Sequence, residues 1–406
     1  MLAFTFPGQG SQRAGAGRPW LDHPSWELVH EVSEAAGRDV ASLLLDADAD
    51  ELRATRNAQL ATFTLSLLVL DAIERLGIAP SAVAGHSLGE YSALVASGAL
   101  GFEDGVKLVV ERSEAMQAAA DDEDGTMVVL VGVSDADAEA ACQRAEGGAW
   151  VANFNAPGQV VIAGTPEGVA TASEIAKAMG ARKVLPIPVG GAFHTPLMAP
   201  ARARLRKALA HATFSDPEVP VTANVDARAH TLASEWPGLL SAQLCGPVRW
   251  HQTLLGLASQ AQSSQVQGTI VEVGPGGVLT GLAKRTIPEQ RLLAVATPDD
   301  LDALVDALSG DSPLHTYALA HAGEHLYMSE RVVVSPATGI FEPLPCAASV
   351  EVGGVLGTVG ETDVRTPFAG ALMGLLAMRG ERVVTGQPVA WLRTGSSGAD
   401  SPSGGL

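Results

Sequence analysis

The sequence is poor in cysteine, in basic residues and in aromatic side chains, and it has no long apolar run. Its three cysteines lie far apart, without metal-type or redox-type spacing, so we expect small buried residues and no metal site. Lysine and arginine number 26 against 45 aspartates and glutamates, and the formal net charge of −19 argues against nucleic acid as a partner. The apolar runs are too short to span a bilayer, and the first residues show no basic leader. These features predict a cytoplasmic protein that binds no membrane.

Apolar residues make up 47% of the 406 residues, which is ample for two or three domains. Over residues 1–124 short apolar strands alternate with apolar-rich helices, and the same rhythm resumes over residues 190–308. Strands are expected at 81–84, at Val219–Asn224 and at 269–273, the last running into a helix. Such alternation predicts a parallel sheet covered by helices, and therefore an α/β domain.

Residues 125–189 follow a different pattern, which predicts a small domain inserted into the larger one. The expected order is strand, helix, strand, strand, helix, strand, at residues 127–133, 135–145, 150–155, 159–163, 167–179 and 183–188. This order is typical of a ferredoxin-like split unit.

The C-terminal part differs in composition from the rest. Residues 309–330 contain His315, His321 and His325, and a solvated linker is favoured over a metal site because no acidic or sulfur ligand completes the set. Residues 331–394 contain an internal repeat, in which Ser335-Pro-Ala-Thr-Gly-Ile-Phe341 is echoed by Thr366-Pro-Phe-Ala-Gly-Ala-Leu372. Two β-rich halves predict a small flattened barrel, and the Gly/Ser-rich residues 395–406 are expected to be disordered.

Ser87 lies in Gly85-His-Ser-Leu-Gly-Glu-Tyr91, directly after the apolar pair Val83-Ala84. Gly-x-Ser-x-Gly between a strand and a helix predicts a sharp turn that exposes a nucleophilic hydroxyl, and the glycines are needed because a Cβ would crowd the approaching helix. The alternative is an ordinary Gly-Ser turn.

A serine nucleophile needs a base and an oxyanion hole. His194, after a Gly-Gly break where the inserted domain rejoins the larger one, is the best candidate for the base. His86 is the less favoured alternative, because adjacent residues on a tight turn point apart. The backbone N–H of Leu88, the residue after the nucleophile, is the expected first oxyanion donor, and Gln9 can supply a second.

Several segments occur together in the order found in one enzyme family. They are Phe6-Pro-Gly-Gln-Gly-Ser-Gln12, Gly85-His-Ser-Leu-Gly-Glu-Tyr91, Asn153-Phe-Asn-Ala-Pro-Gly-Gln159, Ala192-Phe-His194, Asn224-Val-Asp226 and Glu272-Val-Gly-Pro-Gly-Gly-Val-Leu-Thr-Gly-Leu282. Over residues 2–308 the chain resembles malonyl-CoA:acyl carrier protein transacylases. The resemblance implies an α/β-hydrolase-like domain (1–124 and 190–308) with a ferredoxin-like insert (125–189).

The same resemblance implies an activity and its residues. Malonyl would pass from coenzyme A to the phosphopantetheine thiol of an acyl carrier protein, for fatty-acid or polyketide synthesis, through an acyl ester on Ser87. His194 would be the base, without a triad carboxylate, and Gln9 and Leu88 would donate to the oxyanion. Arg112 matches the arginine that grips the carboxylate, a role suited to a guanidinium fork. No cofactor is implied.

Other positions adjust this expectation. Phe193 points to malonyl, because its ring fills the space that the methyl of methylmalonyl would need. Arg249, expected to bind substrate, stands where some members have a glutamine near the dyad, which leaves the contact to His194 open. Ser113 and Gly277 replace a common glycine and a common lysine. Candidates for docking coenzyme A or the carrier, each equally well explained as a solvated side chain, are Arg202, Arg204, Arg206, Lys207, Lys284 and Arg285.

Residues 331–394 resemble a biotinyl/lipoyl carrier domain. Counting back from Pro367 places Val359 at the hairpin tip where that family has its modified lysine, and no lysine follows Lys284. Attachment of biotin or lipoate is therefore excluded. The segment is expected either to recruit the enzyme to a synthase or carboxylase complex or to be a remnant without function.

A rival to transfer is hydrolysis, in which the same dyad would edit acyl-thioesters on carrier proteins. Arg112 and Phe193 argue against it, because editing needs no clamp for a malonyl carboxylate.

Overall fold

The structure is a computed structural model that describes residues 1–263, 268–309, 330–345, 348–360 and 362–393. The chain divides into two units, one formed by most of residues 1–309 and the other mainly by the strands from residue 330 onward. Residues 310–329, with the three histidines of the predicted linker, and the predicted tail 395–406 lie outside the described residues.

The first unit is built on a six-stranded sheet with the order β10-β9-β1-β2-β7-β8. Its strands are β1 (Leu2–Phe6), β2 (Ala82–Gly85), β7 (Val221–Thr222), β8 (Ala229–His230), β9 (Thr269–Val273) and β10 (Arg291–Val295). All neighbours pair in parallel except β7 and β8, which confirms the predicted parallel sheet. The sheet therefore brings the carboxyl ends of β1, β2 and β9 to one edge, which is where ligands bind in such sheets.

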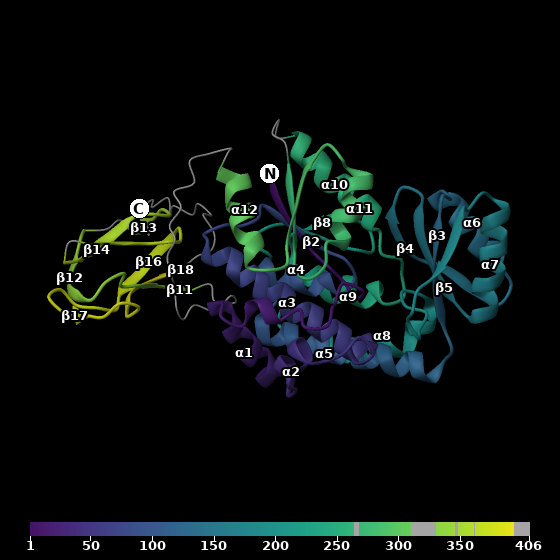
Figure 1. The fold of residues 1–406 in the computed structure, drawn as a ribbon, viewed down its shortest axis with the longest axis horizontal. Helices are drawn as coiled ribbons and strands as arrows, with labels where there is room; N and C mark the ends of the chain where they lie inside the picture. Colours follow the sequence, from purple (N-terminus) through teal and green to yellow (C-terminus); the bar gives the residue numbers. More distant parts are fainter. Residues whose placement is uncertain (264–267, 310–329, 346–347, 361, 394–406) are drawn as a thin grey trace, which may run out of the picture. The chain divides into compact units, whose positions relative to one another are not determined.

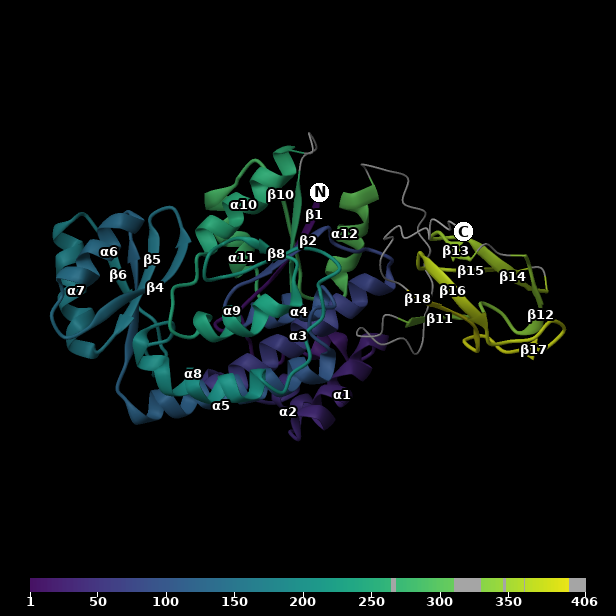
Figure 2. The ribbon, with the colours of Figure 1, turned by 180° about the vertical axis from the view of Figure 1, so that it is seen from behind.

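Helices cover both faces of this sheet, as Figures 1 and 2 show, with α10 and α11 on one side and α12 on the other. The helices of the larger body are α1 (Glu27–Ala36), α2 (Val40–Leu45), α3 (Thr55–Arg75), α4 (Gly89–Ala96), α5 (Phe102–Asp122), α8 (Ala199–Leu209), α9 (Trp236–Gln243), α10 (Trp250–Ser263), α11 (Val278–Thr286) and α12 (Asp299–Ser309). Alternation along each strand sets the packing, since Ala3, Ala82 and Ile270 pack against the buried side chains of α10 and α11. Among the described residues, no helix is long and apolar enough to cross a membrane.

One predicted strand is much shorter than expected. The sequence predicts a strand over Val219–Asn224, whereas β7 has two residues. Pro220 has no N–H to give to a ladder, and after Thr222 the chain turns, with the Ala223 N–H donating to the Arg228 carbonyl. The turn frees Asn224 for contacts with the segment around Ser87.

The inserted segment forms a four-stranded antiparallel sheet with the order β4-β5-β3-β6. Its elements follow the predicted order: β3 (Thr126–Val131), α6 (Asp135–Arg144), β4 (Ala149–Ala156), β5 (Gln159–Gly164), α7 (Pro166–Ala178) and β6 (Lys183–Pro186). Buried residues of both helices pack on one face of the sheet. Strand β4 is joined to the larger body, since the Phe154 N–H donates to the Val248 carbonyl and the Val248 N–H to the Ala152 carbonyl.

The second unit consists of two four-stranded sheets, with the orders β11-β18-β16-β13 and β15-β14-β12-β17. Its strands are β11 (Glu330–Val334), β12 (Gly339–Pro343), β13 (Ser349–Val350), β14 (Val355–Val359), β15 (Thr362–Arg365), β16 (Gly370–Leu375), β17 (Arg382–Val383) and β18 (Pro388–Arg393). The predicted repeat has a structural counterpart. Ser335 Oγ donates to the Ala337 carbonyl (2.6 Å), and Thr366 Oγ1 donates to the Phe368 carbonyl (2.7 Å).

The position predicted for the hairpin tip of this unit is wrong. Val359 is the last residue of β14, pairs with Thr362 and is 2% exposed. The tip follows Val359, because an apolar side chain at this position is held in the core between the two sheets.

Candidate active site

Ser87 lies at the turn between β2 and α4 with a φ of +53°. For a residue other than glycine this left-handed conformation costs about 1–3 kcal/mol, which the surrounding structure must supply. A Cβ at Gly85 would lie 1.9 Å from the backbone of Gly89, and a Cβ at Gly89 would lie 2.0 Å from the Phe6 carbonyl oxygen. The strand, turn and helix predicted around Ser87 are thus confirmed, with the physical reason for both glycines.

The Ser87 hydroxyl contacts one imidazole directly. Ser87 Oγ lies 2.8 Å from His194 Nε2, and His194 Nδ1 lies 2.8 Å from the Gln243 carbonyl oxygen. A carbonyl only accepts hydrogen bonds, so Nδ1 carries the proton and the lone pair of Nε2 faces the serine. The arrangement is a dyad in which a main-chain carbonyl orients the base.

Burial determines the charge of His194. The residue is only 4% exposed. This burial, assisted by the positive charge of Arg112, lowers the pKa of His194 to about 3. The imidazole is therefore neutral near pH 7 and able to take the serine proton. His86 instead contacts Asn155 Oδ1 (3.0 Å) and the edge of the Trp250 ring, so the structure places His194, not His86, against Ser87.

Two amide side chains hold the turn that carries Ser87. Asn224 Oδ1 accepts from the Ser87 N–H (2.7 Å), and Asn224 Nδ2 donates to the Gly85 carbonyl (2.6 Å). Gln243 Nε2 donates to the Ser87 carbonyl (2.8 Å). Gln243 was missed from the sequence, because it ends α9 in a segment without any glycine-rich or catalytic motif.

Arg112 projects from α5 into the same site and is fully buried. Its Nη1 donates to Gln59 Oε1 (2.6 Å), and its Nη2 donates to Gln243 Oε1 (2.9 Å) and to Ser87 Oγ (3.0 Å). Its Nε finds no hydrogen-bond partner among the described residues. Burial lowers the pKa of Arg112, yet a guanidinium stays charged in proteins. A buried cation with a spare donor beside the nucleophile favours an anionic substrate.

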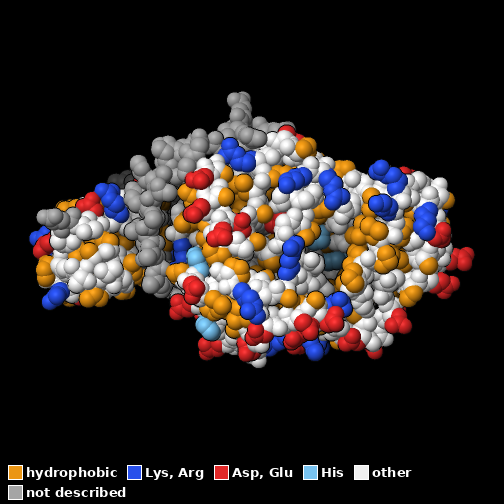
Figure 3. Space-filling view, in the orientation of Figure 1, with side chains coloured by type: hydrophobic (Ala, Val, Ile, Leu, Met, Phe, Trp, Pro, Cys, Tyr) orange, Lys and Arg blue, Asp and Glu red, His pale blue; other side chains and the backbone are white. Residues whose placement is uncertain are grey.

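A pocket of about 100 Å³ opens on the nucleophile between the larger body and the small sheet. It is lined by Gln9, His86, Ser87, Met116, Met127, Asn153, Ile187, Val189, Phe193 and His194. In the described chain, the backbone N–H groups of Gln9 and Leu88 make no hydrogen bond, so both are free to donate to an oxyanion. Figure 3 shows this face of the molecule hollowed beside the small sheet, with histidine atoms deep in the hollow.

Comparison with known proteins identifies the family of this chain. Residues 3–316 match the family model of the acyl transferase domain. The chain is 39% identical over 319 residues to the malonyl CoA-acyl carrier protein transacylase of Bacillus subtilis, covering 77% of this chain and 98% of that protein. The chain belongs to the malonyl-CoA:acyl carrier protein transacylase family.

Solved structures of the family match about three quarters of this chain. The acyl-carrier-protein S-malonyltransferase of Burkholderia pseudomallei 1710b is 39% identical with a TM-score of 0.70, covering 75% of this chain and 99% of that one. A malonyl-transacylase in complex with its type II PKS acyl-carrier protein is 36% identical with a TM-score of 0.71, covering 75% and 99%. The family match ends at residue 316, before the strands of the second unit.

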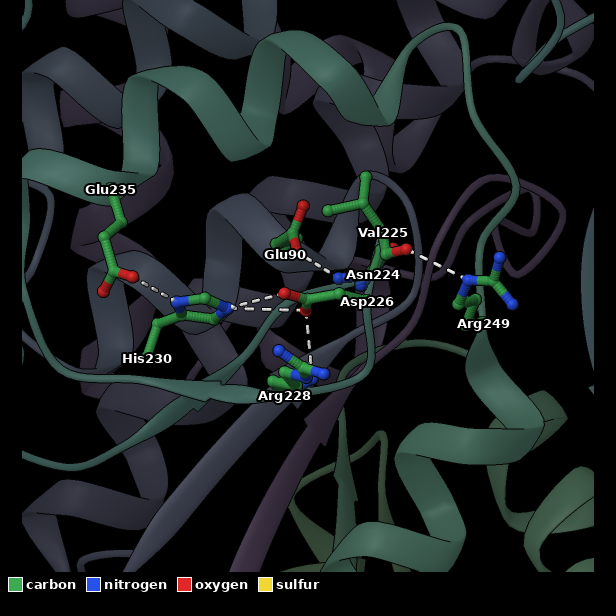
Figure 4. Close-up of polar contacts among 8 residues, drawn as sticks. All are labelled: Glu90, Asn224, Val225, Asp226, Arg228, His230, Glu235 and Arg249. Atoms are coloured by element: carbon green, nitrogen blue, oxygen red, sulfur yellow. Dashed lines mark hydrogen bonds and ion pairs between the residues drawn. The ribbon is translucent and has the colours of Figure 1, made fainter.

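In this member of the family, Arg249 does not touch the dyad. Its Nε donates to the Val225 carbonyl (3.0 Å), as Figure 4 shows, and its guanidinium lies 5.5 Å from the centre of the Phe154 ring. The contact to His194 is instead made by the main-chain carbonyl of Gln243, six residues before Arg249. Substrate binding by Arg249 stays a prediction.

Two of the candidates for docking, Arg204 and Arg202, contact other side chains of the protein. Arg204 Nε and Nη2 form ion pairs with Glu111 and Glu114 on α5, and Arg202 Nε donates to Ser241 Oγ (3.1 Å).

In the described part of the chain no three His, Cys, Asp or Glu side chains are grouped so as to hold a metal ion.

Proposed function

We propose that this chain transfers malonyl from coenzyme A to the phosphopantetheine thiol of an acyl carrier protein, through a malonyl ester on Ser87. The observation that carries the proposal is the buried Arg112 guanidinium, which lies 3.0 Å from the Ser87 hydroxyl and whose Nε has no hydrogen-bond partner within the described ranges. In malonyl-serine the free carboxylate is separated from the ester carbonyl by one methylene carbon. An anion so close to the nucleophile matches a cation at this position.

In the first half-reaction His194 Nε2 takes the proton of Ser87 Oγ, and the oxygen attacks the thioester carbonyl carbon. The N–H groups of Gln9 and Leu88 receive the oxyanion. Collapse of the adduct breaks the carbon–sulfur bond, and the proton on His194 passes to the coenzyme A sulfur. The imidazolium that forms is transient, in keeping with the low pKa of His194.

In the second half-reaction the carrier thiol gives its proton to His194 and its sulfur attacks the malonyl ester. The carbon–oxygen bond breaks, and the proton returns from His194 to Ser87 Oγ. A wider cavity of about 520 Å³, between α6, β4 and residues 245–247, also reaches His194 and offers room for an incoming thiol. Water must be excluded between the two steps, and the small acyl pocket supports this.

The test of the function is a comparison of transfer with hydrolysis. Purified protein, labelled malonyl-CoA and a holo acyl carrier protein are expected to yield labelled carrier much faster than free malonate. The rival hypothesis of an editing hydrolase requires the reverse, with malonyl and acetyl carriers cleaved equally.

Replacing Arg112 with alanine is expected to lower the preference for malonyl over acetyl by about 30-fold or more, because losing a buried charged partner costs about 2 kcal/mol or more. Arg112→Lys is expected to restore little, since an ammonium does not reproduce the fork. The measurement is the ratio of kcat/KM for malonyl-CoA and acetyl-CoA. Arg204→Ala, which removes a partly exposed arginine paired with the same helix, serves as the control. An unchanged ratio in Arg112→Ala would contradict the role of Arg112.

Shortening Phe193 to alanine is expected to admit a branched extender. Phe193 is 6% exposed and lines the acyl pocket, so its removal opens space for one methyl group. The ratio of kcat/KM for malonyl-CoA to that for methylmalonyl-CoA is expected to fall by roughly 10- to 200-fold, the range for one methyl group in a pocket. The ratio is the readout because the truncation also lowers stability. A variant that rejects methylmalonyl as strongly as the wild type would show that another residue sets this specificity.

We further propose that residues 1–124 and 190–308 form an α/β-hydrolase-like domain, and that residues 125–189 form a ferredoxin-like insert. The parallel sheet and the order β4-β5-β3-β6 support these assignments. The two sheets of the second unit and the matching hydroxyl bonds of its repeat support a biotinyl/lipoyl-like domain over 331–394 without an attachment lysine. The cytoplasmic location remains a prediction.

The proposed role of the second unit is recruitment of the enzyme to a synthase or carboxylase complex. Deleting residues 310–406 is expected to leave malonyl transfer intact and to abolish co-purification with such a complex. If neither changes, the unit is a remnant.

A further inference from the structure

A carboxylate lies buried behind the dyad, and the mechanism above assigns it no role. Glu90 is on α4, three residues after Ser87, and is 1% exposed. Its Oε1 accepts from the Asn224 backbone N–H (2.7 Å), and its Oε2 accepts from Gln243 Nε2 (2.5 Å). Figure 4 shows Glu90 facing Asn224. A buried carboxylate is costly unless its oxygens are hydrogen-bonded, and here both are.

Through Gln243 the carboxylate is linked to Arg112, to the main chain of Ser87 and to His194. Gln243 Oε1 accepts from Arg112 Nη2, while Gln243 Nε2 donates to Glu90 and to the Ser87 carbonyl. A guanidinium only donates and a carboxylate only accepts, so the two charges allow one orientation of the amide. The main-chain carbonyl of the same glutamine receives His194 Nδ1–H.

Through Asn224 the carboxylate reaches the backbone of the turn. The Asn224 N–H is held by Glu90, and the Asn224 side chain then bonds the Ser87 N–H and the Gly85 carbonyl. Glu90 therefore fixes both residues that hold the strained turn, and one of them also orients the base.

We propose that Glu90 is a positioning residue for acyl transfer, whose carboxylate holds Asn224 and Gln243 so that Ser87, His194 and Arg112 meet in reactive geometry. The proposal rests on the proposed function, because it is read out through acylation of Ser87. A proton on either oxygen would replace an acceptor by an O–H donor that faces an N–H donor, and one of the two bonds would break. The geometry thus requires the ionised form.

The burial of Glu90 and the charges around it determine the pH at which its carboxyl group ionises. Burial raises the pKa of Glu90 to about 7, against the bonds from Asn224 and Gln243 and the positive charge of Arg112 on α5. Asp226, in the loop after β7, raises it further, and Tyr91 on α4 itself is neutral because burial raises its own pKa. His194, with a pKa of about 3, does not titrate in this range. The acylation rate is therefore expected to fall as the pH drops below about 7.

Stability is expected to respond in the opposite direction. The pKa of Glu90 is raised on folding from 4.5 to about 7, so the folded state binds the proton more tightly. The resulting stabilisation is fully present below the unfolded value and is lost as the pH rises through the folded value. Between these limits Glu90 makes the protein less stable and more active as the pH increases, which separates positioning from a role in folding.

Glu90→Gln keeps the shape and mimics the protonated form. The experiment is single-turnover acylation of Ser87 by labelled malonyl-CoA from pH 5 to 9. At pH 8 the variant is expected to react about 10- to 100-fold more slowly, the effect of losing one hydrogen bond to a charged group. It is also expected to lack the acid limb, which is the fall in the wild-type acylation rate below about pH 7. Its unfolding midpoint in urea at pH 8 should be no lower than that of the wild type. If Glu90→Gln reacts at the wild-type rate and keeps the acid limb, the proposal is overturned. It is also overturned if Glu90→Gln reacts slowly, is less stable than the wild type and keeps the acid limb.

Asp226→Asn is the second variant, because it changes the field at Glu90 without removing either hydrogen bond. Asp226 contacts His230 Nε2 (3.1 Å), and Nδ1 of the same ring contacts Glu235 (2.9 Å), as Figure 4 shows. Removing the Asp226 charge is expected to move the limb to lower pH and to leave the rate at pH 8 unchanged. Glu235→Gln alters the same cluster without contacting Glu90 and is expected to leave the limb in place. If the acid limb stays at the same pH in Asp226→Asn, its assignment to Glu90 is contradicted. A wild-type protein that transfers no malonyl would refute the proposed function instead.

Discussion

Replacing Ser87 with alanine is expected to lower malonyl transfer by about 10⁴-fold or more, the order of loss seen when a serine nucleophile is removed. The hydroxyl is the group within 2.8 Å of His194 Nε2, and without it no covalent malonyl-enzyme can form. The measurement is transfer of label from malonyl-CoA to a carrier protein, together with label retained on the denatured enzyme. Label bound to Ser87→Ala at the wild-type level would show that another residue is the nucleophile.

Ser92 offers a matched control for this variant. It lies on the helix that follows Ser87, is fully buried, and its hydroxyl finds no hydrogen-bond partner among the described residues. Ser92→Ala removes a serine hydroxyl from the helix next to the turn and is expected to leave transfer unchanged. A large loss of activity in both variants would indicate damage to α4 and not loss of chemistry.

Replacing Gly89 with alanine is expected to lower the free energy of unfolding by about 3 kcal/mol or more, at the upper end of overpacking effects. The added Cβ would lie 2.0 Å from the Phe6 carbonyl oxygen and 2.9 Å from the Pro7 carbonyl oxygen. Both atoms belong to the backbone, so no side chain can rotate away. The helix would have to move from the sheet and would carry the Ser87 turn with it, so activity is expected to fall as well.

Urea unfolding of Gly89→Ala and Gly281→Ala tests this expectation, because the free energy of unfolding is expected to change in opposite directions in the two variants. Gly281 is inside α11, where a Cβ has nothing within 4 Å. Alanine is the better helix former by about 1 kcal/mol, so Gly281→Ala should be stabilising. Helix propensity also favours alanine at Gly89, and the expected destabilisation there therefore arises from the contact with the strand. A stabilised Gly89→Ala would show that the turn can open.

The parts of the site that could be predicted from the sequence are local. The turn at Ser87 depends on five consecutive residues, and the need for Gly85 and Gly89 follows from how closely a helix approaches a strand. The elements of the small sheet were predictable for the same reason, since each is defined by its own periodicity. The strand at 219–224 was predicted too long, because its apolar residues do not reveal where hydrogen bonding leaves the sheet.

The residues that support the dyad could not be predicted in this way. Gln243 acts partly through its main-chain carbonyl, which any residue possesses, so no side-chain pattern marks the position. Arg249 was chosen instead because a glutamine is expected near the dyad, and the two positions differ by less than two helical turns. Which of them faces His194 depends on how α9 packs against the loop that contains His194.

The sequence by itself determined that this chain carries a strained turn at a serine, followed by an arginine and a histidine in the order found in transacylases. It also determined that the C-terminal repeat has no lysine that could be modified. These properties follow from residue identity and short spacing, which need no tertiary contact. Tertiary structure alone decided that Arg112 is buried against the nucleophile, that Gln243 orients the base, and that Glu90 is a buried carboxylate with a pKa of about 7. Burial and hydrogen-bond partners are created when segments far apart in the chain pack together, so the charge states on which the chemistry depends exist only in the folded protein.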